Sequence, residues 1–307
     1  MYDAVLLVSF GGPEGPDDVV PFLRRVAAGR AVPDERLAEV AEHYHRFGGV
    51  SPINGANRAL KAAIEDLLRR DGPPLPVYWG NRNWHPLLED TVAAMAGDGV
   101  RRAVAFVTSA YSSYSSCRQY LEDIERARGA AGAGAPRIDK LRPFYNHPGF
   151  IGPFARATGA ALEELGQRGG DAHLVFSAHS IPLAMAETSE YRRQLIQSSE
   201  LVAGAVARSS GRDHPWRLVF QSRSGPPSVP WLEPDVNSAL AELAGAGAQA
   251  AVIVPIGFVS DHLEVVYDLG VVALGTARRL GINAVRAATP GTDPEFVAMA
   301  RELILER

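Results

Sequence analysis

The sequence places an imidazole and a carboxylate after two separate apolar runs. His179 ends the apolar part of LVFSAHSIP (174–182), and Glu264 follows the apolar part of VIVPIGFVSDHLEVVYD (252–268). If both runs are parallel strands, the two side chains stand at carboxyl ends of strands and can share a cleft. An imidazole and a carboxylate in one cleft can bind a metal ion, move protons, or do both in sequence.

More titratable groups lie close to Glu264 in the chain. Asp261, His262 and Asp268 fall in the same stretch, and Glu264 and Asp268 are four residues apart, so a helix there places both carboxylates on one face. Two like charges in a cleft raise the pKa of at least one of them. This pattern suits the transfer of protons and is poor for closed structural zinc, which needs four Cys or His ligands. A histidine that ends a buried strand is also commonly structural, and the pattern alone leaves that alternative open.

Three other segments carry candidate binding groups: SFGGPEGPDDV (9–19), GNRNWHP (80–86) and TSAYSSYSSCRQY (108–120). The first allows close approach of the backbone to a ligand, or is a tight turn. The second sets an aromatic ring beside a cation, which suits a flat anionic ligand or a buried Trp. The third is rich in hydroxyl and aromatic groups that can line a pocket for a large planar molecule. Neither GxGxxG nor GxxxxGK[ST] occurs, so nucleotide binding has little support.

Composition excludes several classes of protein. A net charge of −4 argues against a nucleic-acid partner, which needs a basic face. No apolar stretch approaches the roughly 20 residues that span a bilayer, and the first residues do not resemble a signal peptide, so we expect a cytoplasmic protein without membrane insertion. The one cysteine, Cys117, cannot form an internal disulfide or by itself hold an iron–sulfur cluster or structural zinc.

Strand-like and helix-like patterns alternate along the whole chain. Short apolar runs predict strands at 4–10, 76–81, 103–111, 140–145, 172–180, 216–222, 250–258 and 284–290. Amphipathic stretches between them, such as 59–70, 86–96 and 237–247, predict helices. This alternation is typical of parallel sheets covered by helices on both faces. Four runs fall before about residue 147 and four after it, which suggests two similar doubly wound domains. The Ala/Gly-rich segment 127–137 is expected to be a surface loop.

Seven segments in this order resemble the ferrochelatase family, which inserts ferrous iron into a porphyrin, and most closely its actinobacterial members. They are LLVSFGGPEGPDDV, HYHRFGGVSPIN (43–54), GNRNWHP, TSAYSSYSSC, LVFSAHSIP, FQSRSGPPSVPWLEPDV (220–236) and PIGFVSDHLEVVYDL (255–269). The resemblance implies an α/β fold of two Rossmann-like domains, 1–147 and 148–307, each a four-stranded parallel sheet flanked by helices. It implies an active-site cleft between them and allows the C-terminal helix to pack back on the first domain.

The resemblance also assigns residues to the site. His179 and Glu264 match the family's pair at the metal-insertion centre, and which of them binds iron and which takes a proton stays open. Asp268 matches an outer carboxylate that contacts the metal. The expected contacts with the porphyrin and its propionates are Tyr44, Ser51, Arg30, Tyr120 and Phe10.

The chain departs from the family pattern in three places. Phe10 stands where some members carry a tyrosine that ligates the product iron, so His179 becomes the candidate ligand. Gly270 and Val272 replace acidic residues beyond Asp268, which shortens the expected metal path. Cys117 stands alone where many relatives use four cysteines for a [2Fe–2S] cluster, so we expect no cluster and no permanently bound cofactor.

The resemblance therefore implies a lyase of heme biosynthesis that converts coproporphyrin III and Fe²⁺, both substrates, into coproheme and two protons. Insertion into protoporphyrin IX or another tetrapyrrole is the enzymatic alternative. A porphyrin- or heme-binding chaperone is the alternative from another class, and a proton acceptor facing the pyrroles argues against it. A monomer with transient contacts to neighbouring heme-pathway enzymes is expected from the resemblance alone.

Overall fold

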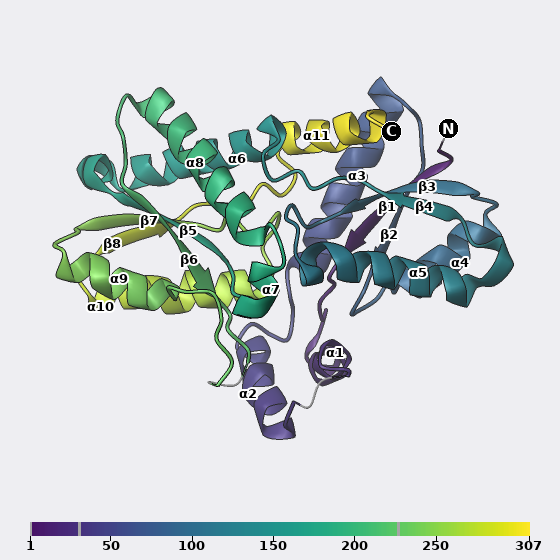
Figure 1. Ribbon diagram of the computed structural model, residues 1–307, viewed down its shortest axis with the longest axis horizontal. Coiled ribbons are helices and arrows are strands. Elements are labelled where there is room, and N and C mark those ends of the chain that lie inside the picture. The colour runs from purple at the N-terminus through teal and green to yellow at the C-terminus, as the bar shows by residue number, and fades with distance from the viewer. Residues whose placement is uncertain (1, 30–31, 226–227) are drawn as a thin grey trace.

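The computed structural model describes residues 2–29, 32–225 and 228–307 and contains two four-stranded parallel sheets (Figure 1). The first has the order β2-β1-β3-β4 and the second the order β6-β5-β7-β8, so the two halves share one topology. The strands are β1 (Ala4–Ser9), β2 (Val77–Asn81), β3 (Arg102–Val107), β4 (Arg137–Lys140), β5 (His173–His179), β6 (Trp216–Gln221), β7 (Ala250–Val254) and β8 (Asn283–Arg286). The predicted fold class is confirmed.

Helices cover both faces of each sheet, as the figure shows. They are α1 (Val19–Val26), α2 (Asp34–His45), α3 (Ile53–Asp71), α4 (Leu88–Gly97), α5 (Gln119–Ala131), α6 (Pro148–Glu164), α7 (Leu183–Glu187), α8 (Tyr191–Ser210), α9 (Val236–Gly245), α10 (Leu274–Arg279) and α11 (Pro294–Leu305). Two π-helices, η2 (Tyr114–Arg118) and η5 (Val265–Ala273), follow β3 and β7. Among the described residues, no helix is both long and apolar enough to cross a membrane.

One hydrophobic cluster spans both halves of the chain. Along β1, Val5 and Leu7 join this central cluster, whereas Leu6 and Val8 face the opposite side, because successive side chains of a strand alternate between its faces. The central cluster also receives side chains from β3, β5 and β7 and from α3, α6, α8 and α11. Separate clusters lie under α4 and α5 in the first half and under α9 and α10 in the second.

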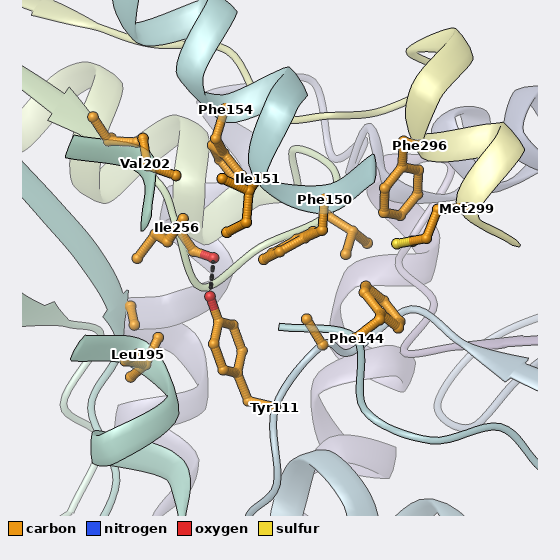
Figure 2. Packing of buried hydrophobic residues seen from close by; sticks show 14 of the residues in the cluster. Tyr111, Phe144, Phe150, Ile151, Phe154, Leu195, Val202, Ile256, Phe296 and Met299 are labelled. Atoms are coloured by element: carbon orange, nitrogen blue, oxygen red, sulfur yellow. Dashed lines mark hydrogen bonds between the residues drawn. The ribbon is translucent and has the colours of Figure 1, made fainter. Parts of the chain in front are cut away.

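Polar contacts also join the halves. Tyr111 lies in the loop after β3, and Ile256 lies in the loop after β7. The Tyr111 hydroxyl donates to the Ile256 carbonyl at 2.8 Å (Figure 2). Helix α11 packs against both α6 and α3, and Arg301 Nε donates to the Gly72 carbonyl at 2.8 Å. The division at residues 147 and 148 stays a prediction, because the central cluster runs across it.

Two local predictions are wrong. The fourth strand is Arg137–Lys140 and not 140–145, because Pro143 has no N–H to offer a strand ladder and Leu141 turns into the central cluster. The segment 127–137 is not all loop: α5 continues to Ala131, since alanine favours helix, and stops at Gly132, whose φ of 77° suits glycine.

Candidate active site

The imidazole of His179 lies at the carboxyl end of β5, beside the carboxylate of Glu264 from the segment after β7. His179 Nδ1 is 2.5 Å from the Ser180 carbonyl oxygen, which can only accept, so Nδ1 carries the hydrogen. Nε2 lies 3.6 Å from Glu264 Oε2, and when the ring is neutral its lone pair is on this nitrogen. The side chains are 34% and 48% exposed, so both remain accessible to a ligand.

The peptide between His179 and Ser180 is held on both sides. Its carbonyl accepts a hydrogen bond from the Tyr191 hydroxyl at 3.0 Å, and its N–H donates to the Gln221 carbonyl at 2.8 Å. The Ser180 hydroxyl is also tied, donating to the Leu232 carbonyl at 2.9 Å. These bonds fix the backbone that aims the imidazole.

The loop that carries Glu264 lies directly against the end of β5. A Cβ on Gly257 would stand 2.8 Å from Ala178 Cα, so only glycine allows this approach. The Gly257 N–H donates to the Ser177 carbonyl at 3.1 Å. The strand β7 ends at Val254 because Pro255 follows it, and the chain is thereby free to turn toward His179.

Asp268 lies on the π-helix η5, one turn after Glu264. The stretch is helical, which is the condition under which the two carboxylates share a face, but its π hydrogen bonding is a feature that the sequence pattern does not reveal. Burial raises the pKa of Asp268 to about 6, a hydrogen bond from the Ser222 hydroxyl opposes the rise, and the charge of Glu264 adds to it. The direction of this pKa shift agrees with the prediction, but its first cause is burial, and the like charge of Glu264 is a smaller cause.

An aromatic cluster from the first half packs beside this loop. Leu263 is buried together with Phe22 of α1 and Tyr44 of α2. Burial, and then the charge of Glu264, raise the pKa of Tyr44, so its hydroxyl stays protonated. The ring of His43 stacks on Tyr267 of η5 at 4.2 Å between centroids. The α1–α2 segment therefore rests on the same segment that carries Glu264 and Asp268.

The predicted substrate contacts occupy different depths. Phe10 is 38% exposed and meets Phe22 edge-on at 6.3 Å. Ser51 is buried beneath Gly12, where a Cβ would stand 2.7 Å from Ser51 Cβ. Tyr44 and Tyr120 are buried as well, and Arg30 lies outside the described residues.

Asparagine amides fix the strand ends of the first sheet. Asn54 Nδ2 donates to the carbonyls of Gly12 at 3.1 Å and His85 at 3.0 Å, and Asn81 Nδ2 donates to Asn54 Oδ1 at 3.2 Å. The loops that follow β1 and β2 are therefore joined through α3.

A buried ion pair lies behind Phe10. Arg82 and Asp123 approach to 2.7 Å with side chains only 8% and 6% exposed. The Arg82 guanidinium also lies 4.7 Å from the centroid of the Tyr120 ring and 5.9 Å from that of Phe10. Tyr120 thus packs against a structural ion pair rather than at an open surface.

The sequence reasoning missed Gln221 and Ser222, which stand at the carboxyl end of β6 beside His179 and Asp268. The rule that ligands sit beyond the carboxyl ends of strands applies to them equally and is the signal that could have found them. Across residues 2–29, 32–225 and 228–307, no group of three or more His, Cys, Asp or Glu side chains is arranged to hold a metal ion.

The whole fold is similar to that of SirB, which is named a sirohydrochlorin chelatase. SirB from Bacillus subtilis with Fe³⁺ superposes with a TM-score of 0.59 at 14% identity, covering 99% of this chain and 96% of that one. The fold is therefore of the two-domain chelatase type.

The family model of ferrochelatase matches residues 2–307, and the chain belongs to the ferrochelatase family, whose members are enzymes. A Frankia alni protein named coproporphyrin III ferrochelatase is 58% identical over 312 residues, covering 99% of this chain and 79% of that protein. A Streptomyces coelicolor protein of the same name is 52% identical over 320 residues, covering 100% and 85%.

Proposed function

We propose that this enzyme inserts Fe²⁺ into coproporphyrin III and releases coproheme and two protons, acting as a lyase of heme biosynthesis. The observation that carries the proposal is the accessible pair of His179 Nε2 and Glu264 Oε2, 3.6 Å apart at one end of the second sheet. Relatives at 52% and 58% identity that are named for coproporphyrin III support the choice of porphyrin.

The reaction needs proton acceptors and a ligand that replaces water on the ion. With Nδ1–H held by the Ser180 carbonyl, His179 offers Nε2 as the acceptor for pyrrole protons. Glu264 supplies carboxylate oxygen, a ligand that exchanges readily with water on a divalent ion. Asp268, with a pKa of about 6, can accept a proton and release it near neutral pH, and serves as the outer carboxylate.

The porphyrin would lie against the strand ends of the first sheet. Phe10 supplies an accessible ring there, and its phenyl group cannot ligate iron, which leaves His179 to bind the product. Tyr44, Ser51, Tyr120 and Arg30 are proposed to surround the propionates. Since the first three are buried, they would act mainly by shaping the wall.

The remaining expectations form part of the same proposal. Fe²⁺ is a substrate, and we propose no resident cofactor, because a [2Fe–2S] cluster needs several thiolates and the chain has one cysteine. We propose a cytoplasmic monomer that meets neighbouring heme-pathway enzymes transiently.

An anaerobic absorbance assay tests the function. The protein is mixed with Fe²⁺ and either coproporphyrin III or protoporphyrin IX, and metalloporphyrin bands are followed against a protein-free control. We expect catalytic turnover that is faster with coproporphyrin III. Faster turnover of protoporphyrin IX would contradict the substrate, and porphyrin binding without insertion would identify a binding protein instead.

A further inference from the structure

The buried face of α8 contacts both halves of the proposed site. Tyr191, Gln194 and Ser198 lie on this face at i, i+3 and i+7, and each is at most 5% exposed. Their polar atoms reach outside the helix: the Ser198 hydroxyl donates to the Tyr145 carbonyl at 2.7 Å, in the segment after β4. The face therefore joins parts of the chain that are distant in sequence.

Tyr191 contacts the carboxyl end of β5, which carries His179. Its hydroxyl donates to the His179 carbonyl at 3.0 Å, opposite the bond from the Ser180 N–H to Gln221. Burial raises the pKa of Tyr191, so the hydroxyl remains a donor at neutral pH. The Tyr191 ring meets Tyr111 edge-on at 5.9 Å, next to the Tyr111–Ile256 bond drawn in Figure 2.

Gln194, one turn further along α8, contacts the hydroxyl-rich segment 108–120, which follows β3. Its Oε1 accepts from the backbone N–H of Ser112 at 2.7 Å, which requires the other amide atom to be Nε2. This Nε2 donates to the Ser112 hydroxyl at 3.1 Å. Both polar groups of one glutamine thus bind one residue of the opposite half.

We propose that Tyr191 and Gln194 are positioning residues that hold the His179 imidazole at a fixed position relative to the segment 108–120. The two contacts are one turn apart on a rigid helix, so a shift at one is passed to the other. This inference rests on the proposed function, since this relative position matters for placing a porphyrin nitrogen at His179 Nε2. Misplacement of a reacting group by about 1 Å can cost on the order of 100-fold in rate.

Three variants test the inference in the full-length protein. Tyr191→Phe deletes only the hydroxyl, and Gln194→Met removes both amide bonds at similar volume. Ser199→Ala is the matched control, because the Ser199 hydroxyl is fully buried on the same helix and, within the part of the chain that the structure describes, bonds to the Leu195 carbonyl alone, at 2.8 Å. Thermal unfolding verifies that all three are folded at the assay temperature.

For Tyr191→Phe we expect kcat to fall about tenfold, with the Kd for coproporphyrin III, from fluorescence quenching, changed less than about twofold. For Gln194→Met we expect KM for the porphyrin to rise about fivefold together with a lower kcat. In the double variant, the fold-loss of kcat should be smaller than the product of the two single fold-losses, because both residues hold the same relative position of His179 and the segment 108–120. If both single variants match Ser199→Ala in kcat and KM, the inference is overturned.

A readout without turnover separates this inference from the proposed function. In protein labelled with ¹⁵N-histidine, NMR reports the tautomer and the ¹⁵N chemical shifts of the His179 ring. Tyr191→Phe should change both, and Ser199→Ala neither. Absent iron insertion by the unmodified protein would defeat the proposed function alone, whereas unchanged ¹⁵N chemical shifts of the His179 ring in Tyr191→Phe would defeat the positioning role.

Discussion

The two halves of the molecule have the same scaffold and different strand ends. Both sheets place their first strand between the second and third, and in both a π-helix follows the third strand. Beyond β3 that region is rich in hydroxyl groups, whereas beyond β7 it carries Glu264 and Asp268. The comparison teaches that the topology provides equivalent positions and the side chains decide which half performs chemistry.

The charged pairs of the halves differ in the same way. In the first half, Arg82 and Asp123 are buried and form an ion pair, which is a structural arrangement. In the second, His179 and Glu264 are exposed by a third and a half of their side-chain surface. The first pair should therefore matter for stability and the second for catalysis.

The largest effect is expected at the end of β5. His179→Ala should lower kcat by about 1,000-fold, because it removes the proposed proton acceptor, with the free energy of unfolding nearly unchanged. Ser9→Ala, at the equivalent end of β1, should change kcat less than about fivefold. The metalloporphyrin assay and urea unfolding measure both. Wild-type turnover by His179→Ala would contradict the assignment of catalysis to the strand ends of the second half.

The buried pair of the first half gives the next effect. Asp123→Ala should lower the free energy of unfolding by about 3 kcal/mol, because it leaves the Arg82 cation buried without its partner. Urea unfolding measures the loss. A change below about 1 kcal/mol would contradict a structural role for this pair, and His179→Ala serves as the comparison from the open pair.

The carboxylate beside His179 comes third. Glu264→Gln keeps the size but loses the charge, so we expect kcat to fall about 100-fold and the dependence on Fe²⁺ concentration to change. The control is Glu122→Gln, which follows the first π-helix and bonds to the Tyr114 hydroxyl at 2.9 Å on the exposed surface. Equal activities of the two variants would mean that the halves do not differ in this respect.

The smallest effect is a dependence of stability on pH. The folded pKa of Asp268, about 6, lies above the ordinary value of 3.8, so folding favours the protonated form. The ionised carboxyl therefore costs stability, and this cost grows as pH rises from about 4 through 6. Asp268→Asn mimics the neutral form and should be more stable than the unmodified protein at pH 8, by on the order of 2 kcal/mol.

That difference should shrink toward zero near pH 4, where both proteins carry a neutral group at this position. Urea unfolding at several pH values measures it. An equal advantage at pH 4 and pH 8 would show that packing, and not ionisation, explains the effect of the substitution.

Local patterns were sufficient to predict two sets of four parallel strands, their alternation with helices, and the strands that lead to His179 and Glu264. They failed where neighbours outside the segment decide. KLRPFY was apolar enough to suggest a strand, but Leu141 and Phe144 are buried in the central cluster after β4 has ended. Hydrophobic periodicity cannot distinguish a buried strand from a buried loop in so short a segment, because both bury apolar side chains.

The sequence by itself determined the class of chemistry, since the residue types at strand ends and the family motifs are local. The tertiary structure decided the approach of His179 to Glu264, the depth of Tyr44, Ser51 and Tyr120, and the burial that sets the pKa of Asp268. It also placed Tyr191 and Gln194 of α8 between the halves. Distances, burial and shared hydrogen bonds depend on which distant segments pack together, and no spacing along the chain contains that information.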